Sequence, residues 1–157
     1  MSQKISARAA ELGLTLDTPA SPAANYVSSV RVGNLLHISG QIARQGGNVA
    51  YPGRLGAEVT EEDGVEAARL CALGVLSQIA AVTDDRIDRV ARVVKLGVFV
   101  ASAPGFSKQS IIANGASDLM VQVFGEAGRH ARSAVGVAML PVNSAVEVEA
   151  IIALHDF

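Results

Sequence analysis

The residues that could do chemistry gather near the end of the chain, in the segment 132–154. It contains two runs of β-forming residues, 134–140 and 145–154, and the four residues between them begin with Pro141 and include Asn143 and Ser144. Proline cannot donate to a β ladder, and an Asn-Ser pair favours a turn. The segment therefore predicts a short antiparallel hairpin or corner.

An arginine and two acids stand out in this segment. Arg132 lies at the mouth of the predicted hairpin, and Glu147 and Glu149 are two residues apart on its second strand, so that both carboxylates face the same way. A guanidinium presents paired donors that match a carboxylate. A carboxylate can hold a water molecule and move its proton. From spacing alone, an arginine and a glutamate on neighbouring strands are more often a structural ion pair than a site.

The other polar residues give weaker signals. His37 and His155 are typical of surface positions, whereas His130, two residues before Arg132, is the histidine that could line a cleft. No two histidines share the spacing of metal ligands, so we expect no metal site. Ser39 precedes Gly40 without the G-x-S-x-G context of a nucleophile elbow, which argues against a serine hydrolase.

Composition bounds the class of protein. The 157 residues suit one domain, and a net charge of −2 without a basic cluster makes nucleic acid a poor partner. A single cysteine, Cys71, excludes an internal disulfide framework and favours a reducing, cytoplasmic setting. We expect neither a signal peptide nor a membrane span, because no run reaches the roughly 18 apolar residues that a span needs. Since half of the residues are hydrophobic, a homo-oligomer that buries a second sheet face is expected.

The order of elements predicts an α+β fold. Residues 1–24 form a lead-in and a proline-punctuated connector (18–24), and Gly33-Asn34 joins two strands, 26–32 and 35–39, as a hairpin. Residues 40–56 are expected to be a loop. A helix capped by Thr60 extends to about residue 83, its apolar stripe including Cys71.

A long, almost wholly apolar strand follows at 90–100, typical of a central position. Ser107 is the expected cap of a second helix that extends to about Phe124, with a kink or delay at Asn114-Gly115. The whole order is β-β-α-β-α-β-β in a single domain, 1–157, with both helices on one face of a mixed sheet.

Several spaced segments together resemble a known family. VGNLLHISGQI (32–42), RSAVGVAMLP (132–141) and VEVEAIIAL (146–154) are similar to signature segments of the Rid (YjgF-like, RidA) reactive-intermediate deaminases. Segments 114–119, 124–125 and 128–133 are similar to the branch labelled endoribonuclease L-PSP. The resemblance extends from Tyr26 to the C-terminus, with the motifs in the same order.

The resemblance implies a chorismate-mutase-like fold (bacillus type), assembled as a homotrimer with clefts at the subunit interfaces. It also implies hydrolysis of enamines or imines such as 2-aminoacrylate to a 2-oxo acid and ammonia, without a metal or an organic cofactor. Arg132 then matches the arginine that binds the substrate carboxylate, and Glu147 the acid that positions water. Tyr26, Ser39 and, more weakly, Asn114 match pocket residues.

The sequence also departs from the family pattern. Ala134 stands where many deaminases have a cysteine two residues after the arginine, and Ala24-Asn25 replaces a Gly-Pro pair. Three functions therefore stay open. The first is an imine or enamine deaminase acting on 2-imino acids, the second a non-catalytic trimer that binds a small carboxylate at Arg132, and the third an endoribonuclease, which the acidic balance disfavours.

Overall fold

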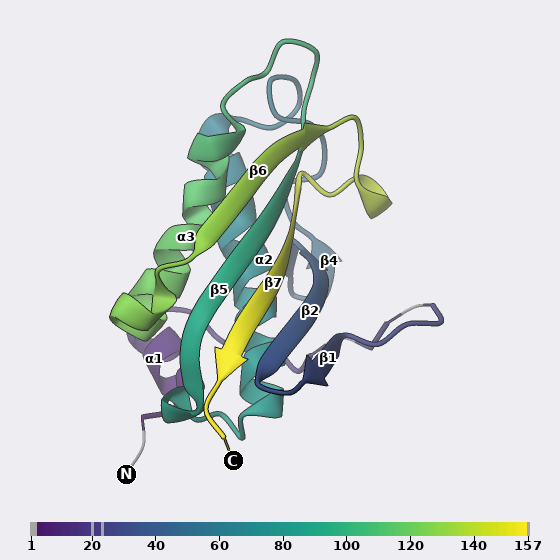
Figure 1. Ribbon diagram of the computed structural model, residues 1–157. Coiled ribbons are helices and arrows are strands. Elements are labelled where there is room, and N and C mark those ends of the chain that lie inside the picture. Colours follow the sequence, from purple (N-terminus) through teal and green to yellow (C-terminus); the bar gives the residue numbers. More distant parts are fainter. Residues whose placement is uncertain (1–2, 20, 23, 157) are drawn as a thin grey trace.

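The computed structural model describes residues 3–19, 21–22 and 24–156, and it forms one mixed sheet covered by helices (Figure 1). The five-stranded sheet has the order β1-β2-β7-β5-β6. Its strands are β1 (Ser29–Val32), β2 (Leu35–Ile42), β5 (Val90–Ala101), β6 (Ala131–Val137) and β7 (Val146–Leu154). The helices are α1 (Ile5–Glu11), α2 (Glu61–Val82) and α3 (Gln109–Phe124), and β3 (Arg44–Gln45) pairs with β4 (Asn48–Val49) in a small separate ribbon.

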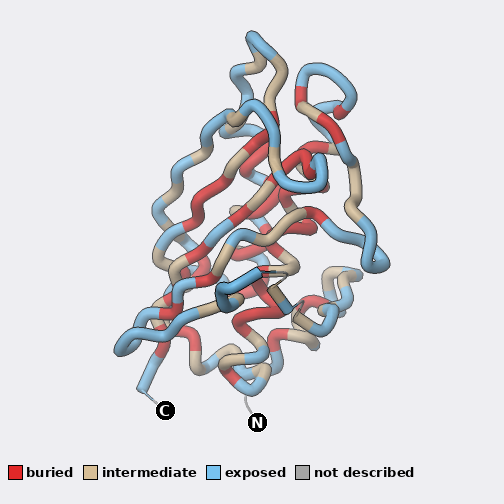
Figure 2. The backbone as a smooth tube through the Cα atoms, turned by 90° about the vertical axis from the view of Figure 1, so that its right-hand side faces the viewer, coloured by how far each residue is buried: buried red, intermediate tan, exposed pale blue. Residues whose placement is uncertain are grey.

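The two long helices cover one face of the sheet, as predicted, and the opposite face is open (Figure 1). Buried residues gather between the two layers, whereas the loops that surround them are mostly exposed (Figure 2). The lead-in adds α1, whose Ile5 and Ala9 are fully buried. Residues 20 and 23 of the expected connector lie outside the described residues. The predicted α+β fold, with its two long helices on one face of a mixed sheet, is confirmed.

Helix α2 begins where the sequence predicts. The Thr60 side chain accepts a hydrogen bond from the Asp63 backbone N–H at 3.2 Å, and three acids in the first turn complement the helix dipole. The helix is long and apolar enough to span a membrane by length and composition alone. Here most of its apolar stretch, including the fully buried Cys71, packs inside the fold, so the hydrophobic core accounts for its composition.

Helix α3 departs from the prediction at two points. It begins at Gln109 with Lys108 as its N-cap and no capping side chain, so the expected cap at Ser107 is wrong. It also continues without a break through Asn114 and Gly115. A Cβ at position 115 would lie 2.0 Å from the Val65 carbonyl oxygen of α2. The glycine therefore permits a close approach of the two helices rather than a kink.

The first hairpin is confirmed, whereas for the segment 132–154, predicted to be a hairpin or a corner, the hairpin is wrong. β1 and β2 pair antiparallel across Gly33, whose φ of +58° suits glycine. β6 and β7 are not paired, because β5 lies between them, parallel to β6 and antiparallel to β7. The apolar β5 is buried because it occupies a central position in the sheet, between β6 and β7. The connection between β6 and β7 therefore crosses the end of β5, through a turn in which Val142 and Asn143 have positive φ.

The expected loop 40–56 also contains regular structure. β2 continues to Ile42, and the β3–β4 ribbon follows. The pairing of β2 with β7 is interrupted between Ile38 and Gln41, which leaves Ser39 and Gly40 in a bulge. This bulge leaves room beside β2 for a side chain from β7.

Candidate functional site

Arg132 points toward the helices from the β6 edge of the sheet. It is in register with Leu96, which is fully buried against the helix layer. Its guanidinium donates from Nη1 to Asn114 Oδ1 at 2.9 Å and to Ser117 Oγ at 3.1 Å, and from Nη2 to the Ser110 carbonyl at 3.1 Å. The N-terminal half of α3 thus fixes the plane of the guanidinium.

His130 joins the same cluster through Ser117. Its Nε2 lies 2.9 Å from Ser117 Oγ, and its Nδ1 lies 2.6 Å from the Gly128 carbonyl oxygen. The predicted residues Arg132, Asn114 and His130 are therefore brought together, and with Ser117 we call them the arginine half-site.

The charge of Arg132 is not neutralised within its own chain. All three of its hydrogen-bond acceptors are uncharged, and it forms no ion pair among residues 3–19, 21–22 and 24–156. In the same described part, Nε makes no hydrogen bond, so Nε–H and one Nη2–H remain available to an acceptor. A planar, oriented guanidinium with these donors is suited to binding a carboxylate or another small anion.

Glu147 lies on the opposite, open face of the sheet. It is in register with Phe99 and Ile42, and its neighbours Val146 and Val148 are fully buried on the helix side. Its carboxylate fills the space above Gly40, where a Cβ would come within 1.9 Å of Oε1. Partial burial, with a smaller contribution from Glu149, raises the pKa of Glu147 above its ordinary value. The site thus holds a carboxylate that is more basic than usual.

Glu147 shares a cavity with two other predicted residues. The cavity measures about 350 Å³ and lies between the β2 bulge, one side of α2 and the chain before β1. The lining residues from the last two parts are Leu70, Leu73, Gly74 and Ser77 of α2, and Asp17, Thr18, Pro19, Ser21, Pro22, Tyr26 and Ser28. Tyr26, which is 56% exposed, and Ser39 both line it. Ser39 Oγ donates to the Val27 carbonyl at 2.8 Å, which ties the connector to the bulge. We call Glu147, Gly40, Ser39 and Tyr26 the glutamate half-site.

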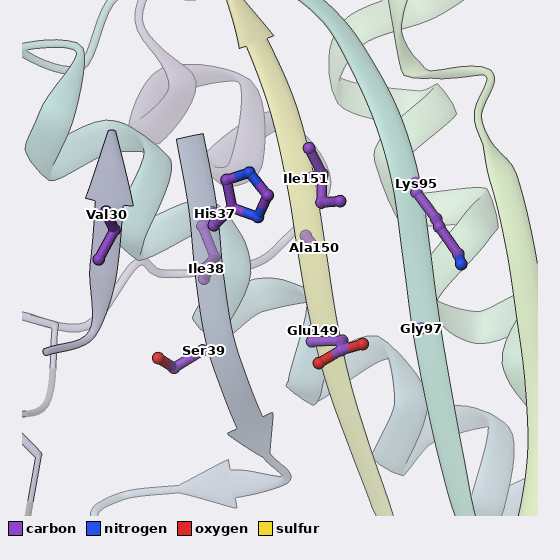
Figure 3. A pocket seen from close by; sticks show the side chains of 9 residues that line it. All are labelled: Val30, His37, Ile38, Ser39, Lys95, Gly97, Glu149, Ala150 and Ile151. Carbon is purple, nitrogen blue, oxygen red and sulfur yellow. The ribbon is translucent and has the colours of Figure 1, made fainter. Parts of the chain in front are cut away.

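A smaller hollow of about 260 Å³ lies on the open sheet face (Figure 3). His37, Lys95 and Glu149 surround it, with the Glu149 carboxylate beside Gly97. His37 and Glu149 are exposed, as expected from the sequence. Among the described residues, no group of three or more His, Cys, Asp or Glu is placed to hold a metal ion.

The arginine half-site lies at the β6 edge of the sheet, whereas Glu147 lies on the central strand β7 and its neighbours Ser39 and Gly40 lie on β2. The order β1-β2-β7-β5-β6 puts Arg132 on one edge strand and Ser39 on the second strand from the other edge (Figure 1). Arg132 faces the helices, whereas Glu147 faces away from them. One chain therefore does not bring the two side chains to one small ligand, nor does it pair them as ions.

Sequence reasoning missed two residues that support the predicted ones. Ser117 follows Asn114 by three positions on a helix, which places both on one face, and this spacing could have been noticed. Gly40 gives no such signal, because its role depends on the strand pairing that puts Glu147 over it.

This fold, with an oriented arginine and an outward carboxylate, defines a small α+β protein of the chorismate-mutase-like class. The family model described as "YjgF/chorismate_mutase-like, putative endoribonuclease" matches residues 6–154, and the chain belongs to this family. The resemblance to the Rid proteins is thereby confirmed.

Two relatives in sequence were found along almost the whole chain. Protein TCP17 of Trypanosoma cruzi is 52% identical over 156 residues, which cover 99% of this chain and 97% of that protein. A 2-iminobutanoate/2-iminopropanoate deaminase of Dermatophagoides farinae is 29% identical over 142 residues, covering 89% and 95%. The deaminase relative supports, in outline, an enzyme of Rid type, whereas the name of Protein TCP17 states no activity.

Solved structures agree with this placement. The protein Atu1372 of Agrobacterium tumefaciens, described as having unknown function, is 44% identical with a TM-score of 0.90, over 96% of this chain and 92% of that one. TdcF of E. coli, solved with bound serine, is 25% identical with a TM-score of 0.61, over 88% and 94%.

Proposed function

We propose that this protein hydrolyses small 2-imino acids, or the enamines in equilibrium with them, to 2-oxo acids and ammonia. The observation that carries the proposal is Arg132, a guanidinium held by three uncharged acceptors and without an ion-pair partner among the described residues. Such a group is suited to an anionic ligand. The imine deaminase relative and the serine bound to TdcF support a ligand that carries both a carboxylate and a nitrogen.

The proposed chemistry needs few groups. Arg132 binds the carboxylate, and Glu147 holds a water molecule and accepts its proton as the water oxygen adds to the imine carbon. The addition turns the C=N double bond into a single bond, and Glu147 passes the accepted proton to the nitrogen. The new hydroxyl then gives up its proton, through the same carboxylate, to the nitrogen as the C–N bond breaks, so that imine and water become ketone and ammonia. A raised pKa makes Glu147 a better base for this transfer. The reaction changes no oxidation state, which is consistent with the predicted absence of a cofactor.

A complete site requires two copies of the chain. Since Arg132 lies on the edge strand β6 and Glu147 on the central strand β7, with β5 between them and the two side chains on opposite faces, we propose that the arginine half-site of one copy meets the glutamate half-site of the next in a homotrimer. Exposed apolar side chains support such a contact, among them Val30 and Val32 of β1 and Val135 of β6, which are 46–66% exposed. The cytoplasmic location predicted from the sequence remains part of this proposal.

The experiment is 2-oxo acid release from 2-aminoacrylate generated in situ. We expect the unaltered protein to accelerate release, and Arg132→Ala and Glu147→Gln each to abolish most of the acceleration. Arg69→Ala is the matched control, because Arg69 also donates to an uncharged side chain, Gln122, but lies outside both half-sites. Acceleration that survives in Arg132→Ala would contradict the proposal.

Mixing tests the shared site. Co-expressed Arg132→Ala and Glu147→Gln chains form mixed oligomers, in which about a quarter of the interfaces combine the two intact halves if the copies assort at random. Recovery of about a quarter of the activity from two inactive variants would support the composite site. A site built within one chain would give no recovery.

A second candidate, a non-catalytic carboxylate-binding oligomer, is favoured by Ala134. This residue follows Arg132 by two positions, and its methyl group packs partly buried against the core, where many deaminases have a cysteine. Stabilisation of the protein by a 2-oxo acid without turnover of any imine would favour this function. Salt-dependent RNA binding would instead favour the nuclease activity named in the family description.

A further inference from the structure

The hydrogen bonds around His130 have a definite direction. A carbonyl oxygen only accepts, so His130 Nδ1, at 2.6 Å from the Gly128 oxygen, must carry a proton. In the neutral ring, Nε2 is then an acceptor, and the Ser117 hydroxyl donates to it over 2.9 Å. The Ser117 oxygen is left as an acceptor toward Arg132 Nη1 at 3.1 Å. A directed line of hydrogen bonds thus connects a backbone carbonyl to the guanidinium.

These hydrogen bonds determine which N–H groups of Arg132 stay available to a ligand. Nη1 donates to both Asn114 and Ser117, and Nη2 donates to the Ser110 carbonyl. Without Ser117, one Nη1 donor would lose its partner and the guanidinium could rotate about its last bonds. A freely rotating side chain must be ordered again when a ligand binds, which weakens affinity.

We infer that Ser117 and His130 are a positioning pair that holds Arg132 in its anion-binding orientation. Neither residue needs to touch the ligand, because both act through the guanidinium. The inference rests on the proposed function for its ligand, a small carboxylate. A Ser-His pair can also activate a nucleophile, but the Ser117 oxygen already accepts a hydrogen bond from Arg132.

A double-mutant cycle tests the inference. Pyruvate is the probe, pyruvamide is the uncharged control ligand, and binding is followed by NMR titration, which reaches millimolar affinities. We expect Ser117→Ala to weaken pyruvate binding about tenfold, since one hydrogen bond to a charged group is lost, and to leave pyruvamide binding unchanged. In an Arg132→Lys background, the same change should cost less than about twofold, because the positioned group is gone.

Conservative variants separate positioning from general damage to the fold. Ser117→Thr keeps the hydroxyl and should restore affinity to within about twofold of the unaltered protein. His130→Gln places an amide oxygen near the position of Nε2 and should restore more affinity than His130→Ala. His130 contacts Arg132 only through Ser117. If Ser117→Ala fails to fold, pyruvate affinity can therefore be compared between His130→Gln and His130→Ala instead.

A measurement without ligand keeps the inference separate from the proposed function. Rotation of the Arg132 guanidinium can be followed by ¹⁵N NMR of its Nη groups, and it should be hindered in the unaltered protein and fast in Ser117→Ala. If pyruvate does not bind at all, the proposed function fails while this rotation still decides the positioning role. Equal rotation and equal pyruvate affinity in the two proteins, or covalent labelling of Ser117 by a fluorophosphonate, would overturn the inference.

Discussion

Two glycines offer a way to displace each acid of β7 without removing it. A Cβ at position 40 would lie 1.9 Å from Glu147 Oε1, and a Cβ at position 97 would lie 2.7 Å from Glu149 Oε1. Real Cβ contacts are essentially never below 3.0 Å. Gly40→Ala must therefore push the Glu147 carboxylate away by about 1 Å, whereas Gly97→Ala moves Glu149 by a few tenths of an ångström.

The two substitutions should differ in activity far more than in stability. A misplacement of about 1 Å in a catalytic geometry can cost on the order of 10²-fold, so we expect kcat/KM of Gly40→Ala to fall by about that factor. Gly97→Ala should stay within about threefold, because Glu149 affects the proposed chemistry only through its smaller contribution to the raised pKa of Glu147. In each case the colliding atoms belong to a flexible side chain, so the free energy of unfolding should change by less than about 1 kcal/mol.

The assay is again 2-oxo acid release, read together with urea unfolding and oligomeric state for both variants. A Gly40→Ala protein with full activity, and with Glu147 visibly displaced in its crystal structure, would refute the role of Glu147 in holding water. Equal losses in the two variants would also count against it, because a general disturbance of the sheet would then suffice.

Three further predictions concern stability and reactivity. Gly115→Ala should destabilise the protein by about 2–4 kcal/mol in urea unfolding, although alanine is the better helix former, because its Cβ would meet the Val65 carbonyl oxygen of α2 at 2.0 Å. Burial raises the pKa of the Cys71 thiol well above its usual range, so a thiol reagent should label it only as urea unfolds the chain, and labelling of the folded protein would contradict the burial. The raised pKa of Glu147 means that its ionisation costs the folded state stability as pH increases from about 4, the ordinary carboxyl pKa, through the raised value. The stability of Glu147→Gln relative to the unaltered protein should therefore grow over that range in unfolding experiments at several pH values, and a difference independent of pH would refute it.

Much of the fold follows from local sequence signals. The Gly33-Asn34 turn, the Thr60 cap and the apolar strand 90–100 each act over a few residues, and the structure has all three. The signals that failed depend on distant partners. Gly115 looks like a helix breaker unless Val65 of α2 is known to lie against it. Similarly, two strands joined by a turn look like a hairpin unless β5 is known to lie between them.

The same distinction explains how the candidate site could be predicted in its residues but not in its arrangement. Arg132 and Asn114 could be named from motifs, and alternation along β7 puts Glu147 and Glu149 on one face, as observed. The hairpin prediction, however, would have made the strands of Arg132 and of the acids direct neighbours, whereas the inserted β5 separates these strands. Because of this separation, Arg132 has no ion-pair partner in the described chain. The pKa of Glu147 is correspondingly raised rather than lowered, since no nearby cation among the described residues stabilises its charged form. Arg132 therefore keeps a charge that no acid of the described chain pairs, and Glu147 keeps its raised pKa, which are the two properties that the proposed site between two copies requires.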